Sequence, residues 1–358
     1  MPQILLPNEL DSHAVFDGSH RGRLIALGFT LAGLAACAHA TGVSETGVTA
    51  PRRAVSDIAV PVRYDEHRWI VRPVTAGGDT LDLYTDSGGG FLFIARERLG
   101  PDAVFTFAER TPAGDSMFTA AWPAFRTGQD IPPPIYVTPP RITTASAATF
   151  QRQAGAIPVR DGFLGNGWFA GRVWVFDYPA RRLLVRAEHT SPEPLGGATI
   201  PLGFKNGPGG GDAPWFPRIR VAVDGDSLDL LFDTGATTLL TDSARTAVGD
   251  DRPASRAASF ITRTVFDGWR RRHSEWRVIA RGEAGSGADM IEVPALTVAG
   301  FTVGPVWFTA RPDRAFTEYM SQWMDRPVVG ALGGSALHYF RVTVDYPNRR
   351  ATFARPVE

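Results

Sequence analysis

Short runs in which apolar and polar residues alternate recur along most of the chain, separated by glycine, proline and aspartate. Alternation with a period of two is typical of strands, because successive side chains point to opposite faces. Glycine and proline mark the turns between such runs. The pattern therefore predicts many short strands rather than repeated strand–helix units. Four of these runs are residues 69–74, 172–176, 295–298 and 305–309.

Helices are predicted in three short segments only, residues 95–99, 242–248 and 315–323. We expect the first strand near residues 58–62, and its counterpart in the second half of the chain at 200–202.

One strand pattern occurs twice. Residues 81–89 read Leu-Asp-Leu-Tyr-Thr-Asp-Ser-Gly-Gly, and residues 228–236 read Leu-Asp-Leu-Leu-Phe-Asp-Thr-Gly-Ala. A Gly-Asp-Thr or Gly-Asp-Ser turn precedes each copy, so the two align without a gap. Each copy predicts a strand that leaves a hairpin turn and ends at an aspartate, Asp86 or Asp233, in a glycine-containing loop.

A second pair of matching segments follows the first in both halves. Residues 162–165 read Gly-Phe-Leu-Gly and residues 330–333 read Gly-Ala-Leu-Gly. An Asp-Tyr-Pro sequence follows each after the same interval, beginning at Asp177 and at Asp345. Because both pairs of landmarks occur in the same order, we infer an internal duplication.

An apolar strand, Asp-Thr/Ser-Gly, a β-rich interval and an apolar-apolar-Gly segment together resemble the signature of aspartic peptidases. The copies are most similar to bacterial retropepsin-like aspartyl proteases, with two units fused in one chain as in pepsin. The resemblance covers about residues 58–356 and places Gly162 and Gly330 in the loops that bracket the two aspartates. It implies an all-β, bilobal acid-protease-like fold of two pseudo-twofold-related β-barrel lobes with a few short helices.

The resemblance also implies a catalytic pair, Asp86 and Asp233. Two carboxylates about 3 Å apart cannot both ionise cheaply, so they share a proton. The charged member takes a proton from water and the neutral member hydrogen-bonds the carbonyl under attack, without a metal or cofactor. Glycines allow the sharp turn in each loop, and hydroxyls are expected to link the loops across the lobe interface. These supporting residues are Ser87, Gly88, Thr234 and Gly235.

One departure from the pattern changes the expected pH range. Gly89 and Gly90 follow Asp-Ser-Gly, where pepsin-like members usually have a hydroxyl residue, and Ala236 stands at the matching place in the second copy. Each carboxylate then lacks one donor that would favour its charged form, so its pKa should be higher than in pepsin. We expect activity to peak at weakly acidic to near-neutral pH. The three consecutive glycines also leave open a slack first loop and a weak or inactive enzyme.

Residues 1–37 are expected to be an export signal. Two arginines precede a short apolar run that ends at Cys37, and such a run is too short to span a membrane as a mature helix. The sequence Leu-Ala-Ala-Cys at 34–37 resembles a bacterial lipobox, which implies lipidation of Cys37 and an outer-membrane-anchored periplasmic lipoprotein. Ordinary cleavage near Ala36 or Ala40, giving a soluble periplasmic or secreted protein, is the alternative.

The remaining chain is divided by composition. Residues 38–57 are small and polar and read as a flexible tether, with a propeptide as the alternative. The two lobes are expected at 58–187 and 198–358, joined by a proline- and glycine-containing linker at 188–197. The glycine-rich segment 206–212 lacks the Lys-Ser/Thr of a phosphate-binding loop and is expected to be a hairpin loop.

Composition excludes several other functions. The 358 residues are 44% hydrophobic, enough for two cores, and carry 37 basic and 37 acidic residues. The basic residues are scattered, so nucleic acid is not an expected partner. Cys37 is the only cysteine, which excludes an intramolecular disulfide. The histidines show no metal-binding spacing, and the Gly-Gly-Ser-Ala-Leu at 333–337 fails as a nucleophile elbow.

Two parts of the expected cleft stay unassigned. Pepsin-like enzymes close a hairpin that carries a tyrosine over the dyad, and no residue is assigned to that role. The aromatic candidates after the first aspartate are Phe105, Phe107, Phe118, Trp122 and Tyr136. Residues 260–276, which include three consecutive arginines, are expected to form either a substrate-facing hairpin or a surface loop.

Two functions remain. The first is a monomeric aspartic endopeptidase that cuts extended or unfolded polypeptides and meets the membrane only through a lipid anchor at Cys37. The second is a non-catalytic envelope protein that binds a peptide or a partner in the cleft between the lobes.

Overall fold

The computed structural model describes residues 57–356, with the exception of 112, 155–156, 158, 187–195 and 207–215. The predicted signal, nearly all of the tether and most of the linker and of the glycine-rich insert lie outside these residues. Among the described residues, no helix combines the length and apolar character needed to cross a bilayer.

The first half of the chain forms an eight-stranded sheet around the strand that carries the first aspartate motif. Within this sheet, strand β4 pairs in parallel with β9 and antiparallel with β3. In spatial order the strands are β2 (Val62–Asp65), β3 (Arg68–Val71), β4 (Leu83–Thr85), β9 (Gly162–Leu164), β5 (Leu92–Ile94), β8 (Arg141–Thr144), β7 (Ser116–Ala121) and β6 (Thr106–Arg110).

The second half forms a nine-stranded sheet with the same relations around the second motif. Here β14 pairs in parallel with β23 and antiparallel with β13. The strands in spatial order are β18 (Val278–Ile279), β19 (Met290–Val293), β22 (Val306–Arg311), β17 (Ser259–Thr262), β23 (Gly330–Leu332), β14 (Asp226–Phe232), β13 (Arg218–Val223), β20 (Leu296–Val298) and β21 (Phe301–Val303). A two-stranded ribbon, β15 (Thr237–Leu239) and β16 (Ser255–Ala257), lies beside it.

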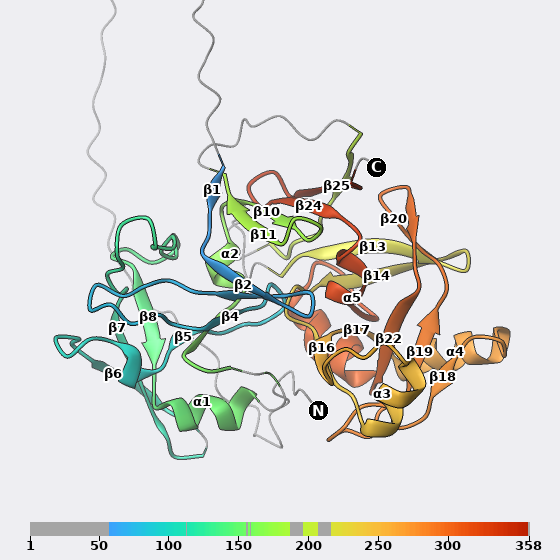
Figure 1. The fold of residues 1–358 in the computed structure, drawn as a ribbon, viewed down its shortest axis with the longest axis horizontal. Coiled ribbons are helices and arrows are strands. Elements are labelled where there is room, and N and C mark those ends of the chain that lie inside the picture. Colours follow the sequence, from blue (N-terminus) through green and yellow to red (C-terminus); the bar gives the residue numbers. More distant parts are fainter. Residues whose placement is uncertain are drawn as a thin grey trace, which may run out of the picture. The chain divides into compact units, whose positions relative to one another are not determined.

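A third sheet joins the halves. Strands β10 (Val173–Asp177) and β24 (Arg341–Asp345) lie side by side at its centre and pair antiparallel, with Val175 opposite Thr343 (Figure 1). Each is the strand that ends in the repeated Asp-Tyr-Pro. In spatial order the strands of this sheet are β1 (Ile58–Ala59), β11 (Arg182–Val185), β10, β24, β25 (Arg350–Ala354) and β12 (Ala198–Pro201). Outwards from the central pair, β11 corresponds to β25 and β1 to β12, so the sheet reflects the duplication.

The strand runs predicted from alternation are confirmed as β3, β10, β20 and β22. Of the predicted helices, α3 occupies Asp242–Val248 as expected. The segment 95–99 forms a short 3₁₀ helix, and the segment 315–323 forms a π-helical turn followed by a 3₁₀ turn. The remaining helices are η1 (Arg96–Arg98), α1 (Ala147–Ala154), α2 (Asn166–Phe169), α4 (Arg263–Arg272), η2 (Ala315–Tyr319), η3 (Met320–Trp323) and α5 (Gly334–Leu337).

The expectation for residues 260–276 was wrong. This segment is neither a hairpin nor a loop, because strand β17 runs directly into helix α4. Phe266 and Trp269 are one turn apart and both are buried, so an apolar stripe holds the helix against the lobe. The three arginines form its last turn, where cations favour the helix dipole.

One ion pair is fully buried in the second lobe. Arg311 donates two hydrogen bonds of 2.8 and 2.7 Å to the carboxylate of Glu283, and its guanidinium lies 4.0 Å from the centre of the Phe260 ring. Thr238 donates a further hydrogen bond of 3.0 Å to Glu283. The carboxylate is therefore satisfied on several sides, as a buried charge requires.

We predict that Glu283→Ala lowers the free energy of unfolding by about 3–5 kcal/mol, because it leaves the buried Arg311 guanidinium without a counter-charge. Urea unfolding measures the change. Asp242→Ala is the control, since the Asp242 side chain is fully exposed and 3.9 Å from Arg245, and we expect a change within about 1 kcal/mol. An equal effect of the two substitutions would contradict the prediction.

Candidate active site

Asp86 and Asp233 are held in matching positions at the ends of β4 and β14. The backbone N–H of Asp86 donates to Leu164 O at 3.0 Å, and that of Asp233 donates to Leu332 O at the same distance. Each aspartate is therefore fixed by the strand that pairs in parallel with its own, β9 or β23. The sequence placed these two strands as the bracketing segments.

Gly162 and Gly330 begin the two bracketing strands, and close packing of the backbone requires glycine at both. A Cβ atom on Gly162 would come within 2.5 Å of Phe93 O, and one on Gly330 within 2.2 Å of Phe260 O. These distances are shorter than any real contact of a Cβ atom, so a side chain at either place would push β9 or β23 away from its neighbour.

The two carboxyl groups meet. A hydrogen bond joins the side chains of Asp86 and Asp233, and each residue is only 6% exposed. The approach requires glycine in both loops, because a Cβ on Gly235 would lie 2.3 Å from Asp86 Cγ and one on Gly88 would lie 2.6 Å from Asp233 Cγ. Residues far apart in the chain thus form one site.

Hydroxyl groups link the two loops in a reciprocal pattern. The Ser87 hydroxyl donates to Phe232 O at 2.8 Å and accepts from the Thr234 N–H at 3.0 Å. The Thr234 hydroxyl accepts from the Ser87 N–H at 3.1 Å. All of these groups are buried, so each bond satisfies polar atoms that water does not reach. The pattern fixes the two aspartate loops relative to each other.

Burial raises the pKa of the Asp86 carboxyl well above its ordinary value, and the neighbouring Asp233 carboxyl raises it further. Burial also raises the pKa of Asp233, but hydrogen bonds from Asp86 and from the N–H groups of Gly235 and Ala236 oppose that rise. The pair therefore holds one proton over an intermediate pH range.

Phe163 explains the missing hydroxyl residue after the first motif. A Cβ atom on Gly89 would lie 2.5 Å from the Phe163 ring, which packs where a serine side chain would otherwise stand. The carbonyl of Gly89 accepts a hydrogen bond of 2.8 Å from the N–H of Asn166, the first residue of helix α2, and this bond fixes the loop against the helix. The glycines of this loop are packed and hydrogen-bonded.

Tyr84 is a site residue that the motifs did not predict. It lies two residues before Asp86, yet its hydroxyl contacts the second loop, at 2.8 Å from Gly235 O and 2.6 Å from Thr237 Oγ1. A comparison of the two copies could have pointed to Tyr84, because the residue at the matching place in the second copy is Leu231, which has no hydroxyl.

The aromatic flap candidates divide into separate groups. Phe105 and Phe107 both pack against Phe118 on the hairpin of β6 and β7. Trp122 packs on Phe125, whereas Tyr136 lies beside helix α2, where a Cβ on Gly167 would be 2.6 Å from its hydroxyl. The contacts therefore place none of the five against the dyad.

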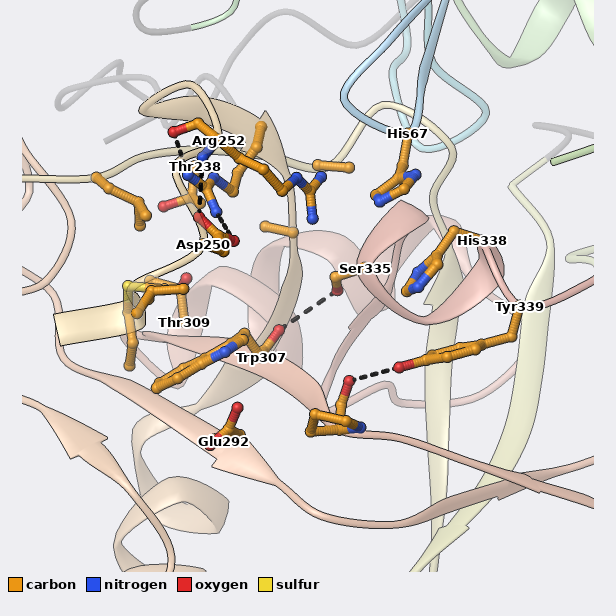
Figure 2. A pocket seen from close by; sticks show the side chains of 17 residues that line it. His67, Thr238, Asp250, Arg252, Glu292, Trp307, Thr309, Ser335, His338 and Tyr339 are labelled. Atoms are coloured by element: carbon orange, nitrogen blue, oxygen red, sulfur yellow. Dashed lines mark hydrogen bonds and ion pairs between the residues drawn. The ribbon is translucent and has the colours of Figure 1, made fainter. Parts of the chain in front are cut away.

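A cavity of about 290 Å³ is lined mainly by residues of the second lobe, together with His67 of the β2–β3 turn (Figure 2). The rings of His67 and His338 stack at 4.3 Å. Burial and the nearby His338 lower the pKa of His67 to about 3. Arg256 in the lining is paired with Asp250 at 2.5 Å. Neither dyad aspartate lines this cavity, so it is separate from the carboxyl pair.

Within the described ranges, no three His, Cys, Asp or Glu side chains gather closely enough to hold a metal ion.

No protein-family model and no curated protein matches the sequence. Solved structures do match. The crystal structure of an aspartic proteinase from Irpex lacteus has a TM-score of 0.50 at 13% identity, over 84% of this chain and 97% of that chain. The structure of edgp (TM-score 0.42, 11% identity, 85% and 96% covered) and that of basic 7S globulin from soybean (0.46, 9%, 84% and 95%) are also similar.

The likeness to the Irpex lacteus enzyme shows the fold. The chain has the mainly β, two-lobed acid-protease fold with a few short helices, so the predicted fold class is confirmed. At 13% sequence identity, this comparison supports a statement about the fold alone.

We predict that Gly89→Ser lowers the free energy of unfolding by about 1–3 kcal/mol, because the new side chain overlaps the Phe163 ring. Combining it with Phe163→Leu should recover part of the loss. Gly90→Ser is the neighbouring control, since its Cβ would lie 3.6 Å from Phe216, an ordinary contact. Thermal unfolding measures all four proteins, and equal effects at the two glycines would exclude the steric explanation.

Proposed function

We propose that this protein is an aspartic endopeptidase of the bacterial retropepsin-like type, with two lobes fused as in pepsin. The observation that carries the proposal is the buried hydrogen-bonded contact between Asp86 and Asp233, held by loops whose glycines permit it. A carboxyl pair that shares one proton supplies an acid and a base at a single point.

The proposed reaction uses the two carboxyl groups in turn. Ionised Asp233 takes a proton from a water molecule, and the water oxygen forms a bond to the peptide carbonyl carbon. Protonated Asp86 gives its proton to the carbonyl oxygen, producing a neutral tetrahedral intermediate. When the C–N bond breaks, Asp233 returns its proton to the leaving amine and Asp86 recovers its own from the hydroxyl. The pair ends in the state in which it began.

The proposed substrate is an extended peptide or an unfolded polypeptide with apolar side chains. Phe91 directly follows the glycines of the first loop and is 45% exposed, which offers an apolar surface next to the dyad. A Cβ atom on Gly90 would lie 3.6 Å from the ring of Phe216, a buried aromatic residue that packs beside this loop. An exposed aromatic surface beside buried polar groups is typical of binding sites.

Export and lipid anchoring at Cys37 belong to the same proposal. They would place a monomeric peptidase in the periplasm at the outer membrane, where unfolded polypeptides are available as substrates. The charge balance of 37 basic and 37 acidic residues gives no support to nucleic-acid binding.

We predict that Asp86→Asn and Asp233→Asn each reduce the cleavage of denatured casein by about 100-fold or more, because either change removes the acid–base pair. Pepstatin inhibition of the wild-type chain is a parallel test. Each variant should be as stable as the wild type at pH 7, or more stable, since a raised carboxyl pKa means that ionisation costs folding energy as the pH rises. Cleavage that survives both substitutions would exclude the dyad. A stable wild-type chain that binds peptides without cutting them would favour the non-catalytic alternative.

We predict a bell-shaped pH profile with its maximum at weakly acidic to near-neutral pH. Below the lower pKa of the pair both carboxyls are protonated and no base remains, and above the higher pKa no acid remains. Burial raises both values, which moves the working range upward. The measurement is kcat/KM on a fluorogenic peptide between pH 2 and pH 9, and a maximum near pH 2 would contradict the prediction.

A further inference from the structure

The hydroxyl of Tyr84 connects the strand of one aspartate to the loop of the other. Tyr84 is buried in β4, and its hydroxyl lies 2.8 Å from Gly235 O. The Thr237 hydroxyl lies 2.6 Å from the Tyr84 hydroxyl and 3.1 Å from Gly235 O, so both hydroxyl groups are within hydrogen-bond distance of this carbonyl. Thr237, Tyr84 and Gly235 therefore form a chain of hydrogen bonds in a buried position.

The peptide group at the end of this chain leads to Asp233. The carbonyl of Gly235 and the N–H of Ala236 belong to one peptide unit, and that N–H donates to the Asp233 carboxylate. The N–H of Gly235 donates to Asp233 Oδ1 at 3.0 Å. A donor on the carbonyl of a peptide polarises the unit and strengthens the bond made by its N–H, most of all where water is excluded.

Among the residues that the structure describes, no such chain of hydrogen bonds reaches the first aspartate. The matching peptide there is Gly88–Gly89, and its N–H groups also donate to Asp86. At the place that corresponds to Tyr84 the second copy has Leu231, and at the place that corresponds to Thr237 the first copy has Gly90. Neither side chain carries a hydroxyl, so the arrangement exists on one side of the pair only.

We propose that Tyr84 is a positioning residue, which acts through the Gly235–Ala236 peptide to make Asp233 the ionised member of the pair and leaves the shared proton on Asp86. Its catalytic meaning rests on the proposed peptidase function, in which Asp233 is the base. The hydrogen-bond geometry itself is independent of that function.

Among the described residues, few other charged and titratable groups interact with this chain of hydrogen bonds or with the dyad. Their interactions with Tyr84 or the dyad identify them as the two aspartates themselves, Arg68 on β3, Tyr178 and Tyr346. Burial raises the pKa of both tyrosines above the range in which the aspartates ionise. Arg68 is engaged with Asp65 at 3.0 Å. Of this set, the two aspartates are therefore the groups that ionise at lower pH than the tyrosines.

The first test does not depend on activity. Urea unfolding of the full chain between pH 3 and pH 8 compares the wild type with Tyr84→Phe, and both with the same proteins carrying Asp233→Asn. The stability loss caused by Tyr84→Phe should grow as the pH rises through the ionisation of the pair, because the hydroxyl stabilises the charged form. In the Asp233→Asn background the loss should be independent of pH. A loss that does not vary with pH in either background overturns the proposal.

The second test is the pH profile of kcat/KM. Tyr84→Phe should move the acidic limb to higher pH by roughly half a unit and leave the alkaline limb in place. Thr237→Val, a milder change in the same chain, should move it in the same direction. Tyr346→Phe is the matched control, because the buried Tyr346 hydroxyl has no hydrogen-bond partner among the described residues. The acidic limb of the kcat/KM profile should not move in this variant.

The outcomes separate this proposal from the proposed function. Equal loss of kcat at every pH in Tyr84→Phe, with an unmoved acidic limb, would show that Tyr84 only supports the fold and would overturn the inference. If the wild-type chain cleaves nothing, the peptidase assignment fails. The stability test still decides whether Tyr84 selects the ionised aspartate.

Discussion

A hydrogen bond between two buried carboxyl groups is the constraint on which this structure depends. Burying one carboxylate already costs free energy, and burying two beside each other is possible only if they share a proton. The loops must bring Asp86 and Asp233 together without a side chain in the way, which is why Gly88 and Gly235 are glycines. The crossed hydrogen bonds of Ser87 and Thr234 then hold the loops in place.

The three sheets follow from the same requirement. Each aspartate stands at the end of a strand that pairs in parallel with a bracketing strand, and these pairs form the centre of each half. The shared sheet around β10 and β24 joins the halves at the second repeated landmark. A duplicated sequence thus places one aspartate from each copy at a common interface, where the N–H of each is bonded to the matching bracketing strand.

Symmetry of the backbone does not make the two aspartates equivalent. The Phe163 ring closes the space beside the first loop, where the second copy has Ala331 at the matching place. The Tyr84 hydroxyl contacts the second loop, whereas its counterpart in the second copy, Leu231, has no hydroxyl with which to contact the first. Hydrolysis needs an acid and a base, and a symmetric pair would not distinguish them. The differences between the copies are therefore as informative about function as the motifs that they share.

The sequence by itself determined the duplication, the strand-rich architecture, the two aspartates and the glycines around them, because these depend on local patterns that both copies repeat. It also placed α3, which has a threonine N-cap and a glycine after its last turn. It missed α1 and α4, which have 8 and 10 residues, because helices this short are stable only when packed against the rest of the lobe. Tertiary structure alone decided that Phe163 fills the place of a hydroxyl, and that Tyr84 reaches a loop about 150 residues away. Both effects arise from contacts between segments far apart in the chain, which no local pattern encodes.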